Sequence, residues 1–196
     1  MKILTYPEQA ARTMADTSEA GMSRIEFVKL DDRYLTRQES NDFIHAILGM
    51  VGESGEIDQT VAISMKDGAL YSPDGELLKS VREEIGDFLW YSSVLARTMG
   101  WPFDRFTRIE FTAPFWGSRG QAVAQMAEMY KKWVFYGKPI DEKKLLKLWA
   151  EAMLHCWEQA HGRRNFETIL EENIEKLRKR FPEKFTEAEA VARADE

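Results

Sequence analysis

The centre of the sequence, residues 40–100, reads SNDFIHAILGMVGESGEIDQTVAISMKDGALYSPDGELLKSVREEIGDFLWYSSVLARTMG. It contains two acidic pairs, Glu53 with Glu56 and Glu84 with Asp87, and each pair sits inside an apolar segment of helical length. Residues three positions apart share one face of a helix. Two such helices that pack antiparallel would bring all four carboxylates to one point.

Glycines stand beside these acids, at Gly52, Gly55 and Gly86. A glycine inside a helix costs roughly 1 kcal/mol relative to alanine. The glycines therefore predict a close approach between helices, which a solvated helix face does not need. The alternative is that the acids are exposed charges on amphipathic helices, which is the usual position of glutamate.

The acidic pairs predict a site for a hard divalent cation. Buried carboxylates are costly unless a cation offsets their charge. Mg²⁺ takes oxygen ligands, keeps several waters and accepts further oxygens from substrate phosphates, and Mn²⁺ can substitute for it. No cysteine or histidine stands beside the acids in the sequence, which argues against zinc. The metal would neutralise phosphates, and a carboxylate of the cluster would take the proton of an attacking water.

Composition indicates one soluble domain. The chain has 196 residues, 44% of them hydrophobic, with six Trp and eleven Phe, which suffices for a packed core. Its formal net charge of −6 disfavours nucleic-acid binding, because that binding depends on Lys and Arg contacts to phosphates. The single cysteine, Cys156, rules out an intrachain disulfide. The sequence has no apolar run of membrane-spanning length and no signal-peptide core after Met1, so we expect a cytoplasmic protein that does not enter membranes.

Apolar periodicity, capping residues and helix breakers predict an all-α fold, and no strand-like alternation occurs. The predicted helices cover residues 5–15, 40–66, 74–98, 119–136, 141–161 and 165–180. Residues 16–39 are expected to form a surface linker, residues 101–117 are left unassigned, and the charged tail from Glu183 is expected to be only partly ordered.

The sequence also repeats weakly at an offset of 65 residues. Residues 52–56 (GESGE) resemble residues 117–121 (GSRGQ), and Lys66 then corresponds to Lys131. On this interpretation the second predicted hairpin is a degenerate copy of the first that has lost its acids. Chance similarity between two helical hairpins is the alternative.

The two acidic pairs and the 27 residues between them resemble the signature of the all-α nucleoside triphosphate pyrophosphohydrolases. That superfamily includes MazG-like proteins, dimeric dUTPases, dCTP pyrophosphatases and phosphoribosyl-ATP pyrophosphatases. The flanking residues are most similar to the MazG-like branch in three stretches, 45–53 (HAILGMVGE), 83–91 (EEIGDFLWY) and 173–185 (NIEKLRKRFPEKF). The resemblance implies a Mg²⁺-dependent enzyme that cleaves nucleoside triphosphates between the α and β phosphates, releasing a monophosphate and pyrophosphate.

The departure from that superfamily is the long segment 101–162, since compact members pass almost directly from the third helix to the last. We therefore expect one domain over residues 1–196 that carries 101–162 as an inserted or degenerate-repeat hairpin. An arrangement in which one chain is similar to both subunits of a dimeric dUTPase is one interpretation of this segment.

The resemblance assigns roles to the acids. Glu53, Glu56, Glu84 and Asp87 would be the metal ligands, and Glu53 or Glu56 would be the base that activates water. Both roles belong to one cluster, so the hypothesis requires these carboxylates to converge in the folded chain.

The resemblance also implies substrate contacts. Asn173, Lys176 and Arg180 fall on one face of the last predicted helix and match a motif at the polyphosphate. The alternative for the two cations is that they stabilise a helix C-terminus. Tyr91, one turn after the second acidic pair, resembles a residue that contacts the sugar, with a core aromatic as the alternative. Lys66, at the end of the second predicted helix, is a further candidate for the phosphates.

The leading hypothesis is a Mg²⁺-dependent nucleotide pyrophosphohydrolase. We expect a homo-oligomer, with a dimer favoured, because an aromatic-rich layer of helices often completes its core with a partner chain. One alternative is a specialist of the dUTPase or dCTPase type. Another is a non-catalytic helical interaction protein that retains the acidic motif.

Overall fold

A computed structural model describes residues 5–11, 27–68, 70–72, 76–108, 117–161 and 163–181. Much of the expected linker, the residues after Arg108 that were left unassigned, and the charged tail lie outside these described residues. So does the expected end of the first helix, at Ala15.

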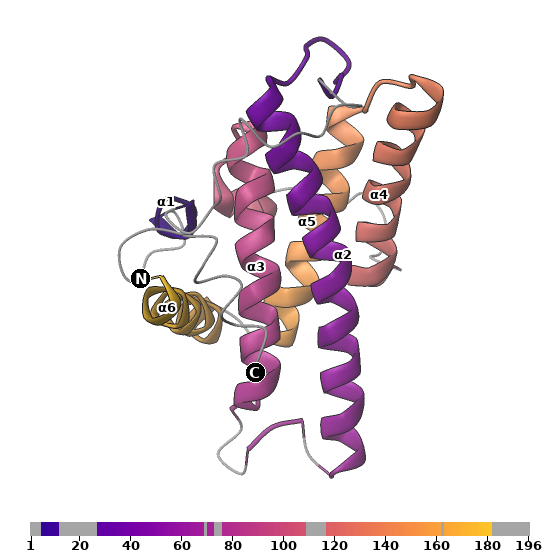
Figure 1. The fold of residues 1–196 in the computed structure, drawn as a ribbon. Coiled ribbons are helices and arrows are strands. Elements are labelled where there is room, and N and C mark those ends of the chain that lie inside the picture. Colours follow the sequence, from indigo (N-terminus) through magenta and orange to yellow (C-terminus); the bar gives the residue numbers. More distant parts are fainter. Residues whose placement is uncertain are drawn as a thin grey trace.

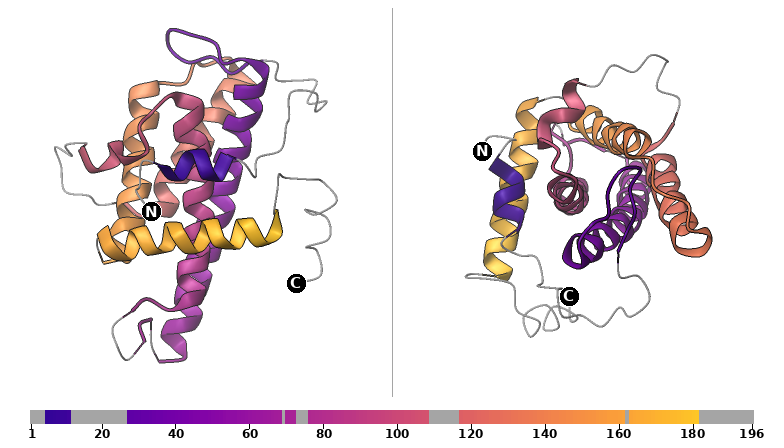
Figure 2. Two further views of the ribbon diagram at one scale, coloured as in Figure 1. Left: turned by 90° about the vertical axis from the view of Figure 1, so that its left-hand side faces the viewer. Right: turned by 90° about the horizontal axis from the view of Figure 1, so that it is seen from above.

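Four long helices form a bundle, and two further helices cross it on one side (Figures 1 and 2). In chain order the elements are α1 (Tyr6–Ala10), α2 (Arg37–Lys66), α3 (Lys79–Met99), the 3₁₀ helix η3 (Phe103–Arg108), α4 (Arg119–Tyr136), α5 (Glu142–Gln159) and α6 (Arg163–Arg180). Helices α2 and α3 run antiparallel along each other, and α4 packs against both α2 and α5. Helices α1 and α6 lie across α3 on the side away from α4 (Figure 2).

The prediction of an all-α fold is confirmed. Within the described residues, extended backbone pairs only as isolated bridges, such as the antiparallel bridge between Tyr71 and Leu77. Helix α4 has the predicted bounds, and α3 ends at Gly100, which adopts the left-handed φ of 70° that stops a helix. The predicted cap of α5 is also confirmed, since the Asp141 side chain accepts a hydrogen bond from the backbone N–H of Lys144 at 2.8 Å.

Helix α2 begins earlier than the sequence pattern suggested. Thr36, rather than Ser40 or Asn41, is its N-cap, and Thr36 and Glu39 form a reciprocal capping box. Ser40 is instead buried inside the first turns, where its hydroxyl accepts the backbone N–H of Val28 at 2.9 Å. The apolar pattern begins only after this polar first turn, so the periodicity placed the start too late.

Helix α3 begins later than predicted, at Lys79 rather than Asp74. Before this helix, Tyr71 and Leu77 form an antiparallel bridge, which the helical pattern did not reveal. The second half of the hairpin therefore has a shorter helix, but its acids still lie in the first turns of α3.

The core between α3 and α5 is aromatic. Trp149 is fully buried on α5, and its ring centroid lies 5.6 Å from that of Trp101 and 6.3 Å from those of Phe103 and Phe106. Its indole N–H donates to the backbone carbonyl of Ser92 on α3 at 3.3 Å. The apolar residues that recur at helical spacing along α6 and just after it are all buried: Phe166, Ile169, Leu170, Ile174, Leu177 and Phe181.

The two segments of the internal echo occupy different helix positions. Residues 52–56 lie in the middle of α2, whereas residues 117–121 form the start of α4, where Ser118 is the N-cap. The two similar segments therefore differ in their place within a helix.

A buried arginine joins α4 to the back of α2. Arg119 is only 5% exposed, and its guanidinium donates to Ser54 at 3.3 Å, Gln159 at 2.9 Å and Asp58 at 2.6 Å. It also lies over the ring of Phe88 on α3, at 5.9 Å from the centroid. The extra hairpin is thus bonded directly to the helix that carries Glu53.

None of the helices in the described part of the chain is both long and apolar enough to cross a membrane.

Candidate metal centre

Three carboxylates meet between α2 and α3. Glu53 on α2 and Glu84 and Asp87 on α3 each offer an oxygen, and these oxygens all lie within 4.8 Å of one another. All three side chains are half-buried. The convergence follows from the antiparallel packing of the two helices and from the spacing of three residues between Glu84 and Asp87.

Glu56, the fourth predicted ligand, does not join this triad of Glu53, Glu84 and Asp87. It lies one turn further along α2, where its side chain is exposed. Its charge still raises the pKa values of Glu53 and Glu84, so the carboxylate is close enough to act electrostatically. Of the four predicted ligands, three converge, and the fourth is their solvent-exposed neighbour.

The triad concentrates negative charge in a partly desolvated position. Burial, together with the charges of Asp87, Glu56 and Glu84, raises the pKa of Glu53 to about 8. Burial and the charge of Asp87 also raise the pKa of Glu84. Such a site gains from any cation that enters it, because a cation removes the repulsion that raises these pKa values.

Helix α6 supplies two groups to Asp87. The Asn173 side-chain amide donates to one carboxylate oxygen at 2.9 Å, and the Lys176 ammonium forms an ion pair with the other oxygen. Asn173 is buried and Lys176 is half-buried. The structure therefore brings these two predicted substrate contacts to the acids themselves.

A glycine permits this approach of α6 to α3. A Cβ atom at Gly86 would lie 3.0 Å from Cβ and 3.1 Å from Nδ2 of Asn173, closer than side chains normally pack. The predicted role of Gly86 is confirmed. The same prediction is wrong for Gly52 and Gly55 within the described part of the chain, where a Cβ at either position would meet nothing within 4 Å. Those two glycines leave an open face on α2 instead.

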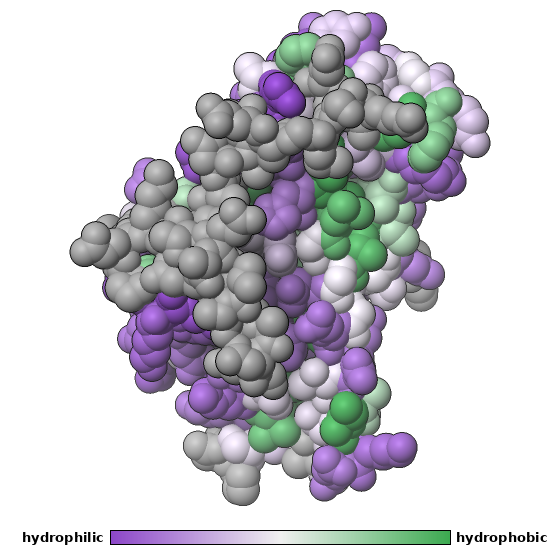
Figure 3. All heavy atoms as spheres, in the orientation of Figure 1, coloured by the Kyte–Doolittle hydropathy of each residue, from purple (hydrophilic) through white to green (hydrophobic). Residues whose placement is uncertain are grey.

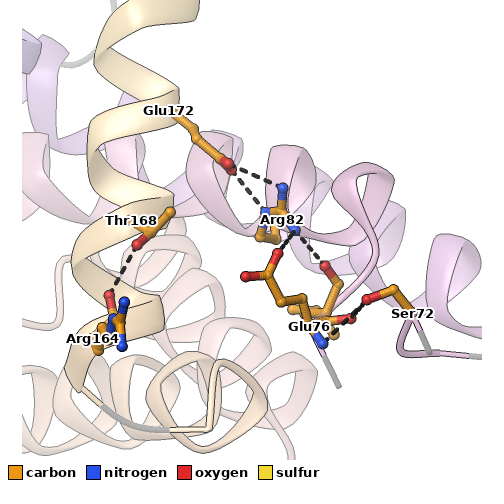
Figure 4. Close-up of polar contacts among 7 residues, drawn as sticks. Ser72, Glu76, Arg82, Arg164, Thr168 and Glu172 are labelled. Carbon is orange, nitrogen blue, oxygen red and sulfur yellow. Dashed lines mark hydrogen bonds and ion pairs between the residues drawn. The ribbon is translucent and has the colours of Figure 1, made fainter. Parts of the chain in front are cut away.

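An arginine clamp fixes α6 one residue before Asn173 (Figure 4). Arg82 of α3 donates to both carboxylate oxygens of Glu172, at 2.9 and 3.0 Å, and to the backbone carbonyl of Leu77 at 2.6 Å. Two parallel bonds of this kind set orientation as well as distance. The clamp was not anticipated from the sequence, because its two partners lie 90 residues apart.

A groove of about 580 Å³ opens between α3 and α6 beside Asn173 and Lys176. Cations and acids both line it: Lys79, Arg82, Lys176, Lys179 and Arg180 on one hand, and Glu83, Glu172 and Glu175 on the other. Arg180, one helical turn after Lys176, thus lies in the same groove, as the shared helix face predicted. Glu83 is exposed and forms an ion pair with Lys79 at 3.4 Å.

Tyr91 lies one turn beyond Asp87 and packs on the backbone of α2. A Cβ at Gly49 would overlap the Tyr91 ring at 2.2 Å, so the ring lies directly against this glycine. The exposed side chain of His45 meets Tyr91 edge-on, with 5.3 Å between ring centroids, and meets Trp90 at 5.8 Å. His45 thus stands at the surface beside the half-buried Tyr91.

Lys66 is not brought to the site. It ends α2 about 20 Å beyond Glu53 at the helical rise of 1.5 Å per residue, and its side chain is exposed. Lys66 was proposed from its position at a helix end, and in a helix this long that end lies far from the acids.

The triad fits a hard divalent cation. All three donors are carboxylates, and the Lys176 ammonium shows that the group already attracts a cation. Oxygen donors of this kind suit Mg²⁺ or Mn²⁺ rather than zinc.

Comparison with protein-family models, with curated proteins and with solved structures found no match to this chain.

Proposed function

We propose that this chain is a Mg²⁺-dependent nucleotide pyrophosphohydrolase that cleaves the bond between the α and β phosphates of a nucleoside triphosphate. The convergence of Glu53, Glu84 and Asp87 within 4.8 Å carries the proposal. The sequence resemblance to the all-α pyrophosphohydrolases supplies the reaction class, and the triad supports it by joining acids that lie more than 30 residues apart.

The proposed metal ligands are Glu53, Glu84 and Asp87. When bound, Mg²⁺ would neutralise phosphate oxygens and make water more acidic. A water oxygen attacks the α phosphorus, the bond from that phosphorus to the bridging oxygen breaks, and pyrophosphate leaves. We assign the water's proton to Glu56, because its exposed carboxylate lies next to the triad without belonging to it.

The groove between α3 and α6 is the proposed phosphate site. Lys176 and Arg180 line it together with Lys79 and Lys179, and its volume of about 580 Å³ has room for a polyphosphate. Lysine and arginine are the side chains that bind phosphate oxygens through charge-assisted hydrogen bonds. Tyr91, one turn after Asp87 on α3, remains the proposed contact to the nucleoside.

The test measures pyrophosphate release from a panel of ribo- and deoxynucleoside triphosphates, with Mg²⁺ and with EDTA. We expect turnover of at least one nucleotide with Mg²⁺ and none with EDTA. Glu84→Gln should lower kcat at least a hundredfold, whereas Glu83→Gln is the matched control. Glu83 neighbours Glu84 in sequence but is exposed and paired with Lys79.

Two results would contradict the proposal. One is the absence of Mg²⁺-dependent turnover across the whole panel. The other is equal activity of the Glu84→Gln and Glu83→Gln variants, because the triad would then have no part in the reaction. Either result would favour a non-catalytic helical interaction protein.

A further inference from the structure

A buried tyrosine from the first helix reaches the back of the proposed metal centre. Tyr6 is fully buried, and its hydroxyl lies 2.6 Å from Oδ1 of Asn173 and 3.3 Å from the carbonyl oxygen of Gly86. Asn173 in turn donates to Asp87 at 2.9 Å. Three elements, α1, α6 and α3, are thus joined in one chain of hydrogen bonds that ends on a triad carboxylate.

The direction of these bonds is fixed by chemistry. The Asp87 carboxylate can only accept, so the NH₂ group of Asn173 must face it. The amide oxygen of Asn173 then faces Tyr6, whose hydroxyl must donate. Burial, together with the nearby charge of Asp87, holds the pKa of Tyr6 well above its usual value, so the hydroxyl keeps its proton.

Several contacts hold Tyr6 and its helix in place. Its ring stacks on Phe103 with 5.5 Å between centroids. The far end of α1 is held by the indole N–H of Trp90, which donates to the Ala10 carbonyl at 3.1 Å. Arg178 of α6 donates to Gln9 at 2.8 Å. The hydroxyl is therefore presented by a helix that contacts both α3 and α6, as an outer support of a binding site should be.

Loss of the hydroxyl would leave the Asn173 oxygen, in a side chain 3% exposed, without its donor. The amide could regain a partner only by rotating, and rotation would turn its oxygen toward the Asp87 carboxylate. We propose that Tyr6 is a positioning residue of the metal centre, which fixes the Asn173 amide so that Asp87 faces Glu53 and Glu84. This role rests on the proposed metal-dependent function.

The first test uses the metal-free protein and needs no activity. Exchange of the Asn173 side-chain NH₂ protons with water is measured by NMR, with the signal assigned through Asn173→Ala. We expect exchange at least tenfold faster in Tyr6→Phe than in the wild type. Tyr71→Phe is the matched control, because it also loses a hydroxyl with a 2.6 Å bond, to His161, but it lies outside the metal centre. An unchanged exchange rate in Tyr6→Phe overturns the proposal.

The second test measures Mn²⁺ affinity by calorimetry. Tyr6→Phe keeps the ring that stacks on Phe103, and we expect it to weaken binding about tenfold, as loss of an outer support typically does. In an Asn173→Ala background the same change should have no further effect, because the hydroxyl acts through that amide. Additive losses would mean that Tyr6 contributes only packing, and they would overturn the proposal.

The outcomes separate this role from the proposed function. A wild-type chain that binds no Mn²⁺ overturns both. Equal Mn²⁺ affinity in wild type and Tyr6→Phe overturns only the role of Tyr6. If Tyr6→Phe does not fold, Asn173→Ala alone tests the proposal. Unchanged Mn²⁺ affinity in Asn173→Ala would overturn it, because the hydrogen bonds from Tyr6 through Asn173 to Asp87 would then have no effect on metal binding.

Discussion

Asn173 donates a hydrogen bond of 2.9 Å to Asp87, across 86 residues of sequence. The bond joins the last helix to the acidic face of α3, and it coexists with the ion pair from Lys176 to the same carboxylate. A carboxylate held by two donors keeps lone pairs free for a further ligand. The contact therefore makes α6 part of the proposed metal centre rather than a cover for the core.

Gly86→Ala should damage both stability and metal binding. The added methyl group would stand 3.0 Å from Asn173, so α6 must shift, and the free energy of unfolding should fall by about 1–3 kcal/mol. Gly55→Ala is the control. Its Cβ would meet none of the described residues within 4 Å, and it should raise the free energy of unfolding by up to about 1 kcal/mol. Urea unfolding and Mn²⁺ calorimetry measure both effects. Equal behaviour of the two variants would contradict the close approach of α6 to α3.

The raised pKa of Glu53 predicts a pH-dependent stability without metal. In the folded chain Glu53 holds its proton up to about pH 8, but in the unfolded chain only to about its usual pKa of 4.5. Between these values the folded state binds more protons, so this group's contribution to stability falls as pH rises. Urea unfolding in EDTA at pH 5 and pH 8 measures the change. Glu53→Gln should remove this part of the slope, and an identical slope in that variant would be the contrary result.

Lys176→Gln should separate metal binding from nucleotide binding. The ammonium competes with a metal for the negative charge of Asp87, so its removal should tighten Mn²⁺ binding several-fold. The same change removes a cation from the groove, and it should raise the KM for the nucleotide. Calorimetry and steady-state kinetics give the two readings. Weaker Mn²⁺ binding in the variant would show that Lys176 supports the metal site instead of competing for it.

Removing Asp58 and removing Arg119 from their ion pair should lower the free energy of unfolding by different amounts. Arg119 is 5% exposed and Asp58 is 67% exposed. Asp58→Ala leaves a buried cation without its carboxylate and should cost roughly 3 kcal/mol of stability. Arg119→Met leaves a carboxylate that water can solvate and should cost about 1–2 kcal/mol. Urea unfolding of the two variants measures the difference. A larger loss in Arg119→Met would reverse this assignment.

The open face of α2 is where we expect a second chain to bind. Leu48 and Val51 are 60% and 40% exposed there, and no described residue lies within 4 Å of a Cβ built at Gly52 or Gly55. Figure 3 shows hydrophobic side chains exposed among hydrophilic ones on the side that carries α2. Light scattering after size exclusion should give the mass of two chains of 22.7 kDa.

Leu48→Glu should convert that dimer to a monomer, because it places a charge in the apolar contact. Phe135→Glu, which changes an exposed hydrophobic residue on α4, is the control and should leave the mass unchanged. A wild-type chain that runs as a monomer would refute the expected homodimer.

The sequence predicted those features that depend on local spacing. The all-α class followed from apolar periodicity, and the convergence of Glu53 with Glu84 and Asp87 followed from the spacing of three residues and the antiparallel hairpin. Glu56 does not converge with the other three acids because a spacing of three residues keeps two side chains only within about 60° of each other around the helix, and the buried part of this face is narrower.

The missed features are those that depend on tertiary packing. Tyr6 meets Asn173 across 167 residues, and Arg119 meets Asp58 across 61, so neither contact has a local signature. The start of α2 is different, because the capping box of Thr36 and Glu39 was readable in the sequence. The glycines show the same limit, because only the packing of α6 places a described side chain against Gly86 and none against Gly52.

The tight contact at Gly86 has a consequence for finding homologues of this chain. Because a side chain there would collide with Asn173, the two positions cannot vary independently. Distant relatives that share the site should carry Gly-Asp on one helix, Asn-x-x-Lys on the last, and a tyrosine near the start of the chain. A sequence search that requires these positions together would find homologues whose overall sequence similarity to this chain is too low to detect.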